Sequence, residues 1–201
     1  MKPLMIRIAA IAAGAVMLAG CITLFPESEP ARQYVLDLPA PELADKAFDV
    51  ARGPIAFTRT AGGDGILTIE NGEASYIDGA RWVIPARQMF EEQVHIAFRA
   101  GPARLTPRGA AGQAKWILRL DVTQFETDYR AGPNGAPIVV VEIKAVMTRN
   151  TRDGQTVEEI FRAEAPAGSN NVGAIIDAYE AALGKSLGDL VGWVSTVGAG
   201  P

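Results

Sequence analysis

Hydrophobic and polar positions alternate most regularly in the second half of the chain. Every second residue from 116 to 122 is apolar, which is the pattern of a strand with one buried face. The same alternation predicts strands over 138–148 and 157–165, and an Asp153-Gly154 turn precedes the last of them. Because links rich in turn-forming residues separate the three segments, we expect them to form an antiparallel meander.

A long amphipathic helix is predicted after the meander, over residues 172–197. Its apolar residues recur at spacings of three and four: Ile176, Tyr179, Leu183, Leu187, Leu190 and Val194. Gly184, Gly188 and Gly192 form a second stripe, and each glycine costs about 1 kcal/mol of helix propensity relative to alanine. The stripe indicates a close packing contact, either with the sheet or with another subunit.

The first half of the chain predicts shorter elements. Alternation favours strands over 33–38 and 54–59, joined by a polar, proline-containing connection. Residues 66–70 and 74–77 are predicted to pair as a hairpin around the Asn-Gly dipeptide at 71–72, since both turn positions tolerate a positive φ.

A second, shorter helix is predicted to begin at Pro85, a residue favoured at the first helical position. Its apolar stripe contains Phe90 and Val94, and the helix is expected to end near Phe98. A brief strand over 103–106 is expected to follow it.

The order of strands, helix, strands and helix predicts the fold class. We expect one domain over residues 33–197, of the α/β (α+β-like) class, with a mixed, largely antiparallel sheet and two main helices packed on it. Residues 198–201 are expected to form a flexible tail.

The N-terminal segment has the features of a lipoprotein signal peptide. Lys2 and Arg7 precede an apolar run that ends in Leu-Ala-Gly-Cys at 18–21, which is similar to a bacterial lipobox. This pattern predicts a signal peptide over 1–20 and lipid attachment, including palmitate, at Cys21. The alternative is an uncleaved membrane anchor, because a charge-free run of 18 residues would extend about 27 Å as a helix.

After cleavage, residues 21–32 would form an acylated tether. Its 11 residues after the cysteine span about 20 Å as a coil, which keeps the domain close to its membrane. Bacterial lipoproteins with aspartate directly after the cysteine stay in the inner membrane, whereas Ile22 follows the cysteine here. We therefore expect the protein at the periplasmic face of the outer membrane.

Composition excludes several classes of function. The formal net charge is −4 with no stretch dense in Lys or Arg, which gives no footprint for nucleic acid. One cysteine and one histidine exclude a disulfide framework and the Cys- or His-rich metal sites. Glu158 and Glu159 are adjacent in a predicted strand and so point to opposite faces. Because no nucleophile or phosphate-loop motif is found either, we expect no enzyme, no cofactor and no metal.

Three aromatic residues are candidates for a partner interface: Tyr34, Trp82 and Trp193. Such side chains are enriched where interfaces are strongest. Aromatic residues also fill cores, and the sequence leaves both roles open for each of the three.

Several segments, in their order and spacing, resemble the ABC-type transport auxiliary lipoproteins, the PqiC-like group. They are the lipobox, Tyr34-Val35-Leu36, Ala80-Arg81-Trp82 ahead of Pro85, residues 118–122 with Phe125-Glu126, Phe161-Arg162-Ala163, and residues 190–194.

The resemblance implies a non-enzymatic lipoprotein that works with an ABC permease, its ATPase and an MCE-domain periplasmic protein. Such systems move phospholipid or other hydrophobic molecules between the two membranes and support envelope integrity. The resemblance also implies a domain similar to the TolB amino-terminal domain, and a homo-oligomer, since relatives can form rings. A different class of function stays open, namely a structural lipoprotein that assists outer-membrane protein assembly or binds cell-wall polymer.

Overall fold

Three long antiparallel strands form one side of the sheet, which confirms the predicted meander. They are β6 (Trp116–Asp128), β7 (Ile138–Arg149) and β8 (Thr156–Pro166), and β7 pairs with both of the others along its length, which leaves β8 at the edge of the sheet.

The computed structural model describes residues 30–58, 60–107 and 114–200. The described residues from Ala31 onward belong to one compact unit. The predicted signal peptide, Cys21 and most of the tether therefore lie outside the described residues.

The other five strands join the free edge of β6 in two groups. The strand β2 (Phe48–Phe57) runs parallel to the beginning of β6 and pairs on its far side with β5 (Ala103–Thr106). The strand β3 (Gly65–Glu70) runs parallel to the end of β6, forms a hairpin with β4 (Glu73–Trp82), and β4 pairs with β1 (Arg32–Tyr34). The result is the predicted mixed sheet, in which the longest pairings are antiparallel.

The turn between β3 and β4 is the predicted one. Asn71 has φ of 49° and Gly72 has φ of 83°, and these left-handed values suit the twist of a tight hairpin.

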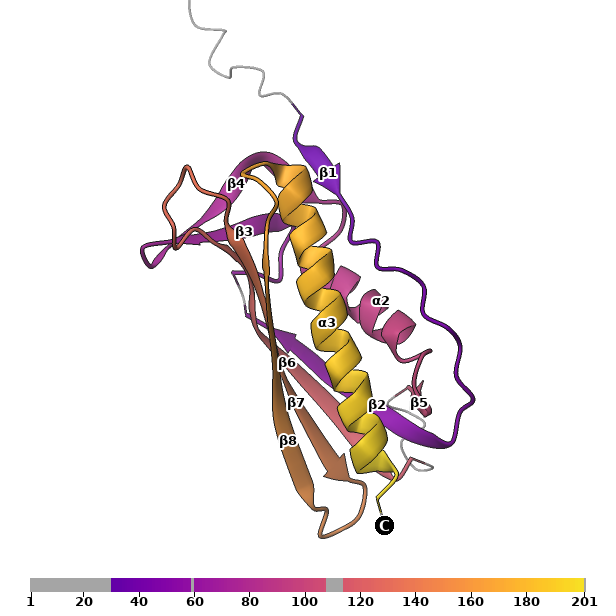
Figure 1. Cartoon of the computed structure of the whole chain (residues 1–201). Coiled ribbons are helices and arrows are strands. Elements are labelled where there is room, and N and C mark those ends of the chain that lie inside the picture. Colours follow the sequence, from indigo (N-terminus) through magenta and orange to yellow (C-terminus); the bar gives the residue numbers. More distant parts are fainter. Residues whose placement is uncertain (1–29, 59, 108–113, 201) are drawn as a thin grey trace, which may run out of the picture. The chain divides into compact units, whose positions relative to one another are not determined.

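Both helices lie on one face of the sheet (Figure 1). The helix α2 (Ala86–Ala97) has Pro85 as its N-cap residue, and α3 (Val172–Gly198) begins at Asn171, whose side chain accepts a hydrogen bond from the backbone N–H of Ala174 at 2.9 Å. Both helix predictions are confirmed to within a residue or so at each end.

Aromatic rings join the helices to the sheet. Phe90 of α2 packs edge-on against Phe57 of β2, with ring centroids 5.6 Å apart, and Tyr179 of α3 lies 4.8 Å from Phe125 of β6. Phe57 in turn contacts Phe125 at 5.5 Å. This chain of contacts places the core between the helices and one sheet face, and leaves the other face open.

A bulge in β6 changes which residues face the helices. The pairing with β7 shifts between Val122 and Gln124, so the buried positions are even-numbered up to Val122 and odd-numbered from Phe125 onward. An extra residue in one strand produces this change of parity. The buried stretch predicted over 116–122 is confirmed, and the strand continues beyond it with the opposite alternation.

Two strand predictions need correction. The first strand ends at Tyr34 rather than 38, because its partner β4 ends at Trp82, opposite Tyr34. The strand predicted over 54–59 begins six residues earlier, at Phe48, where it pairs with β5 and β6. A Gly53-Pro54 break hides this continuity, and the register with β6 shifts across it.

The glycine stripe of α3 does not lie against the sheet. A Cβ atom added at Gly188 or Gly192 would meet nothing within 4 Å, and one added at Gly184 would touch only Leu38, at 3.4 Å. The expected close contact with the sheet is therefore wrong, because the apolar stripe through Tyr179 and Leu183 takes that position instead.

Candidate functional site

The three aromatic residues proposed for a partner interface lie in different places. The side chain of Trp82 is only 1% exposed and packs edge-on against Tyr179, with ring centroids 5.2 Å apart, so it belongs to the core. Trp193 is half-buried and packs against Phe161 at 5.7 Å, and Tyr34 is half-buried on the short strand β1. The structure does not bring the three together into one patch.

An apolar cavity of about 340 Å³ lies between α2, α3 and the segment that follows β1. Its lining consists of small and aliphatic residues together with one amide: Leu38, Pro39, Pro41, Gln93, Ile96, Ala97, Ala100, Gly184, Leu187, Gly188 and Val191. None of these side chains is charged, so the cavity offers a nonpolar environment of the kind found in small-ligand sites.

The cavity exists because three segments approach each other without filling the space between them. The chain after β1 runs as an extended segment beside α2 (Figure 1). Lys46 secures the far end of this segment, because its Nζ donates hydrogen bonds to the carbonyl oxygens of Phe98, Arg99 and Gly101 at 2.8, 3.0 and 2.6 Å. The ammonium thereby satisfies carbonyl groups at the C-terminal end of α2.

Gln93 is the polar group of the cavity lining. Its side chain is 92% buried, and its Nε2 donates a hydrogen bond to the carbonyl oxygen of Leu36 at 3.1 Å. Within the part of the chain that the structure describes, the buried Oε1 atom has no hydrogen-bond partner. An unpaired buried acceptor is unfavourable, because folding removes it from water without replacement.

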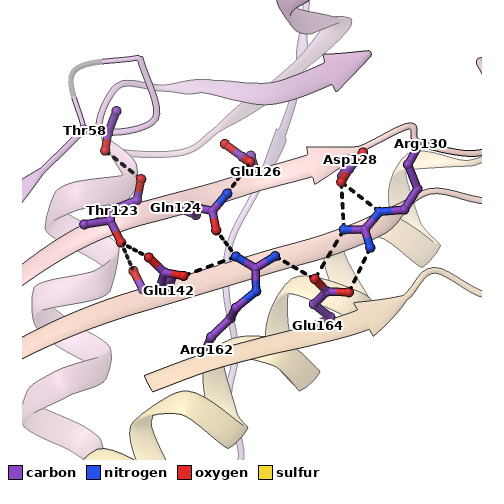
Figure 2. A network of polar contacts seen from close by, with 9 residues as sticks. All are labelled: Thr58, Thr123, Gln124, Glu126, Asp128, Arg130, Glu142, Arg162 and Glu164. Atoms are coloured by element: carbon purple, nitrogen blue, oxygen red, sulfur yellow. Dashed lines mark hydrogen bonds and ion pairs between the residues drawn. The ribbon is translucent and has the colours of Figure 1, made fainter. Parts of the chain in front are cut away.

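The open face of the sheet carries a second notable feature, a network of charged side chains (Figure 2). Arg162 of β8 lies at its centre: it donates to Glu142 at 3.2 Å, to Glu164 at 2.7 Å, and also to the amide oxygen of Gln124. Arg130 binds the other side of Glu164, with Nη1 3.1 Å from Oε2.

The pKa values of two carboxylates in the network are shifted in opposite directions. Hydrogen bonds from Arg162 and then Arg130 lower the pKa of Glu164 below its ordinary value. Burial raises the pKa of Glu126, against the opposing effect of a hydrogen bond from Gln124, whose Nε2 lies 3.0 Å from its Oε1. The face thus carries charged side chains that are paired with one another across the strands.

No group of three or more metal-ligating side chains comes together within residues 30–58, 60–107 and 114–200. No helix in those ranges has the length and apolar character needed to cross a membrane.

The sequence did not predict either the cavity or the network. The glycines of α3 were the one local signal of the cavity, because glycine at spacing four leaves a shallow channel on a helix. The network could have been anticipated only from the strand register, which brings Gln124, Glu142 and Arg162 into one row across three strands.

Comparison with known proteins gives a family and a fold. The model of the ABC-type transport auxiliary lipoprotein component matches residues 34–190, from the last residue of β1 to a point within α3. A crystal structure of a Xanthomonas campestris protein is 24% identical with a TM-score of 0.71, and covers 83% of this chain and 96% of its own. A second solved structure, of an uncharacterized protein, has 14% identity and a TM-score of 0.65, and covers 83% of this chain and 100% of its own. No curated protein matches the sequence.

Proposed function

The chain belongs to the family of ABC-type transport auxiliary lipoprotein components, and from this we propose that it is the outer-membrane subunit of an MCE-type transport system. In this role it would work with an ABC permease, its ATPase and an MCE-domain periplasmic protein, and would not itself catalyse a reaction. The system would move phospholipid or other hydrophobic molecules between the inner and outer membranes.

The observation that carries the proposal is the family match over residues 34–190. It includes seven strands, all of α2 and most of α3, so the family likeness belongs to the domain rather than to a local motif. The lipobox at 18–21 supports the anchor, with acyl chains on Cys21, and Ile22 supports the outer membrane over the inner one. Stable anchoring requires more than one acyl chain, which a bacterial lipoprotein cysteine carries.

The open face of the sheet is the surface that we assign to a protein partner. Neither helix covers it, and Ile160, in the middle of β8, is 56% exposed there. An apolar residue among paired charges is typical of an interface that is kept soluble before its partner binds. A second copy of the chain is the alternative occupant, which would make the protein a homo-oligomer.

Site-specific photo-crosslinking tests the proposal. A photoreactive amino acid at Ile160 would sample the open face, and one at Leu43, which is 69% exposed, would sample the segment between β1 and β2. After irradiation of living cells, the protein would be purified through its own tag and its crosslinked partners identified by mass spectrometry. The unirradiated culture is the control for capture without crosslinking.

We expect an MCE-domain protein crosslinked from Ile160, with the permease recovered in gently solubilised membranes. A crosslinked dimer of the chain from Ile160 would instead assign the open face to a homo-oligomer. Recovery of an outer-membrane assembly component or of cell-wall fragments, without any transporter subunit from either position, would contradict the transport role. It would favour a structural envelope lipoprotein.

A further inference from the structure

The cavity between α2 and α3 extends along both helices. On α3 its lining residues are 184, 187, 188 and 191, and on α2 they are 93, 96 and 97, followed by residue 100 just beyond the helix. Spacings of three and four mark one face of each helix over about two turns. At about 1.5 Å per residue, the cavity follows the helices for about 10 Å.

The lining also restricts the chemistry of an occupant. The walls contain leucine, isoleucine, valine, alanine, proline and glycine, with no aromatic ring to stack on a flat ligand and no charge to bind an ionic one. On the α3 side, Gly184 and Gly188 leave open space beside the side chains of Leu187 and Val191. Neither glycine is required by a tight backbone contact, since Cβ atoms there would meet Leu38 at 3.4 Å and nothing within 4 Å, respectively.

These glycines weaken the helix by about 1 kcal/mol each relative to alanine. No packing contact of the described residues offsets that loss at Gly188. The two glycines therefore leave open an apolar space that no described side chain fills. An unfilled apolar cavity that is kept at a cost in helix stability indicates a site for a nonpolar ligand.

We propose that this cavity binds a single aliphatic chain of a lipid, with the lipid's headgroup remaining outside in water. An extended hydrocarbon chain matches a narrow site about 10 Å long with uncharged aliphatic walls. The inference rests on the proposed transport role only for its biological meaning, because binding itself follows from the geometry of the cavity.

Binding of a series of alkanoates to the mature chain starting at Ile22 tests the proposal. This chain contains the whole compact unit 31–201 and lacks the anchor cysteine, so no acyl chain of its own competes. Hexanoate, octanoate, decanoate and dodecanoate would be titrated by calorimetry. Each added methylene that enters the cavity should raise the affinity about fourfold, and the gain should stop once the chain is longer than the site. Decanol should bind as decanoate does, since the headgroup stays in water.

Two variants of α3 provide the matched comparison. Gly188→Leu places a side chain in the cavity, whereas Gly192→Leu adds the same side chain on the same helix at a position outside the lining. Both positions are exposed and free of contacts, so both variants should fold, which circular dichroism would verify. We expect Gly188→Leu to lower the affinity for decanoate at least tenfold, and Gly192→Leu to leave it unchanged.

Three outcomes would overturn the proposal: no binding of any alkanoate, equal binding by both variants, or binding of decanoate but not of decanol. The last would indicate a site for the carboxylate rather than for the chain. Because these measurements use the purified chain alone, they can fail while the transporter subunits are still captured by crosslinking. The crosslinking can likewise fail while the cavity still binds alkanoates.

Discussion

The hydroxyl group of Tyr179 lies in the centre of the core. It accepts a hydrogen bond from Thr127 at 3.2 Å, and Leu67 offers it a carbonyl oxygen at 3.5 Å. The ring contacts both Trp82 and Phe125. One side chain of α3 thus contacts β3, β4 and β6, and burial raises the pKa of its phenol well above the ordinary value.

This raised pKa predicts a loss of stability in alkali. The phenol stays protonated in the folded protein while the unfolded chain releases its proton at about pH 10, so unfolding becomes easier as the pH rises past that value. Over that range the free energy of unfolding should fall by up to about 1.4 kcal/mol more per pH unit than in Tyr179→Phe. At neutral pH the variant should be about 1 kcal/mol less stable, through the lost hydrogen bonds. Urea unfolding from about pH 8 to pH 11 measures both effects, and parallel curves for the two proteins would refute the first.

The role of Trp82 could not be decided from its residue type and neighbours in the sequence. A tryptophan beside a proline and a helix start is equally consistent with an interface and with a core. The decisive facts are the pairing of β4 with β1 and β3 and the position of Tyr179, and both depend on contacts between distant parts of the chain. No local pattern around Trp82 carries that information.

At the scale of elements, the glycines of α3 have different surroundings although they share a helix. Gly192 is exposed and its added Cβ would meet nothing within 4 Å, whereas a Cβ at Gly198 would overlap the ring of Phe48. The same substitution should therefore have opposite effects at the two positions.

We expect Gly192→Ala to raise the free energy of unfolding by about 1 kcal/mol, because alanine loses less backbone entropy on forming a helix. Gly198→Ala should lower it, since the ring of Phe48 must move away from its partly buried position. Thermal unfolding of the two variants and the parent protein measures the difference. Equal shifts in the same direction would show that the helix end is not packed against β2.

The open face of the sheet allows a similar comparison between two carboxylates. The folded protein lowers the pKa of Glu164, so this group stabilises the fold above its unfolded pKa and loses the effect as the pH falls. The folded protein raises the pKa of Glu126, so this group favours the fold below its unfolded pKa and loses the effect as the pH rises.

Glu164→Gln should consequently destabilise the protein at neutral pH and have a smaller effect in acid. Glu126→Gln should leave stability at neutral pH unchanged or raise it slightly. Urea unfolding at about pH 7 and pH 4 separates the two cases. The assignment of Arg162 and Arg130 as the cause for Glu164 is contradicted if Glu164→Gln destabilises the protein equally at both pH values.

The elements predicted correctly from sequence are those whose pattern is local and long. In the meander and both helices the apolar residues repeat over several periods, and such a long repeat rarely arises by chance. The beginning of β2 has no such signal, because Gly53-Pro54 interrupts it and the strand is held by parallel pairing with β5 and β6. The bulge at Val122–Gln124 depends on cross-strand pairing with β7, which no single-strand pattern contains.

At the scale of the whole molecule, the domain combines an apolar cavity on its helical side with a charged, uncovered sheet face. The cavity was beyond prediction because its three walls come from residues 38–41, 93–100 and 184–191, which are distant in sequence. The family, by contrast, could be predicted from the sequence, because the order of motifs along a chain can be compared without knowledge of the fold.

In the proposed lipoprotein, Cys21 and Ile22 would set the position of this domain in the envelope. We expect Ile22→Asp to retain acylation and to move the protein from the outer to the inner membrane fraction, since aspartate at that position is the retention signal of bacterial lipoproteins. Ile22→Ser is the matched control and should remain in the outer membrane. Incorporation of radiolabelled palmitate, followed by separation of the membranes on a sucrose gradient, measures both properties.

The same experiment on Cys21→Ala separates the lipoprotein from an uncleaved anchor. Without its thiol the chain has no group for diacylglycerol, so palmitate should not be incorporated and the precursor should keep residues 1–20. Palmitate in Cys21→Ala would refute the attachment site, and an inner-membrane parent protein would refute the outer-membrane position. A tether of about 20 Å would then hold the domain beside the inner membrane instead of the outer one. The MCE partner would then meet this domain at the membrane where the permease lies rather than across the periplasm.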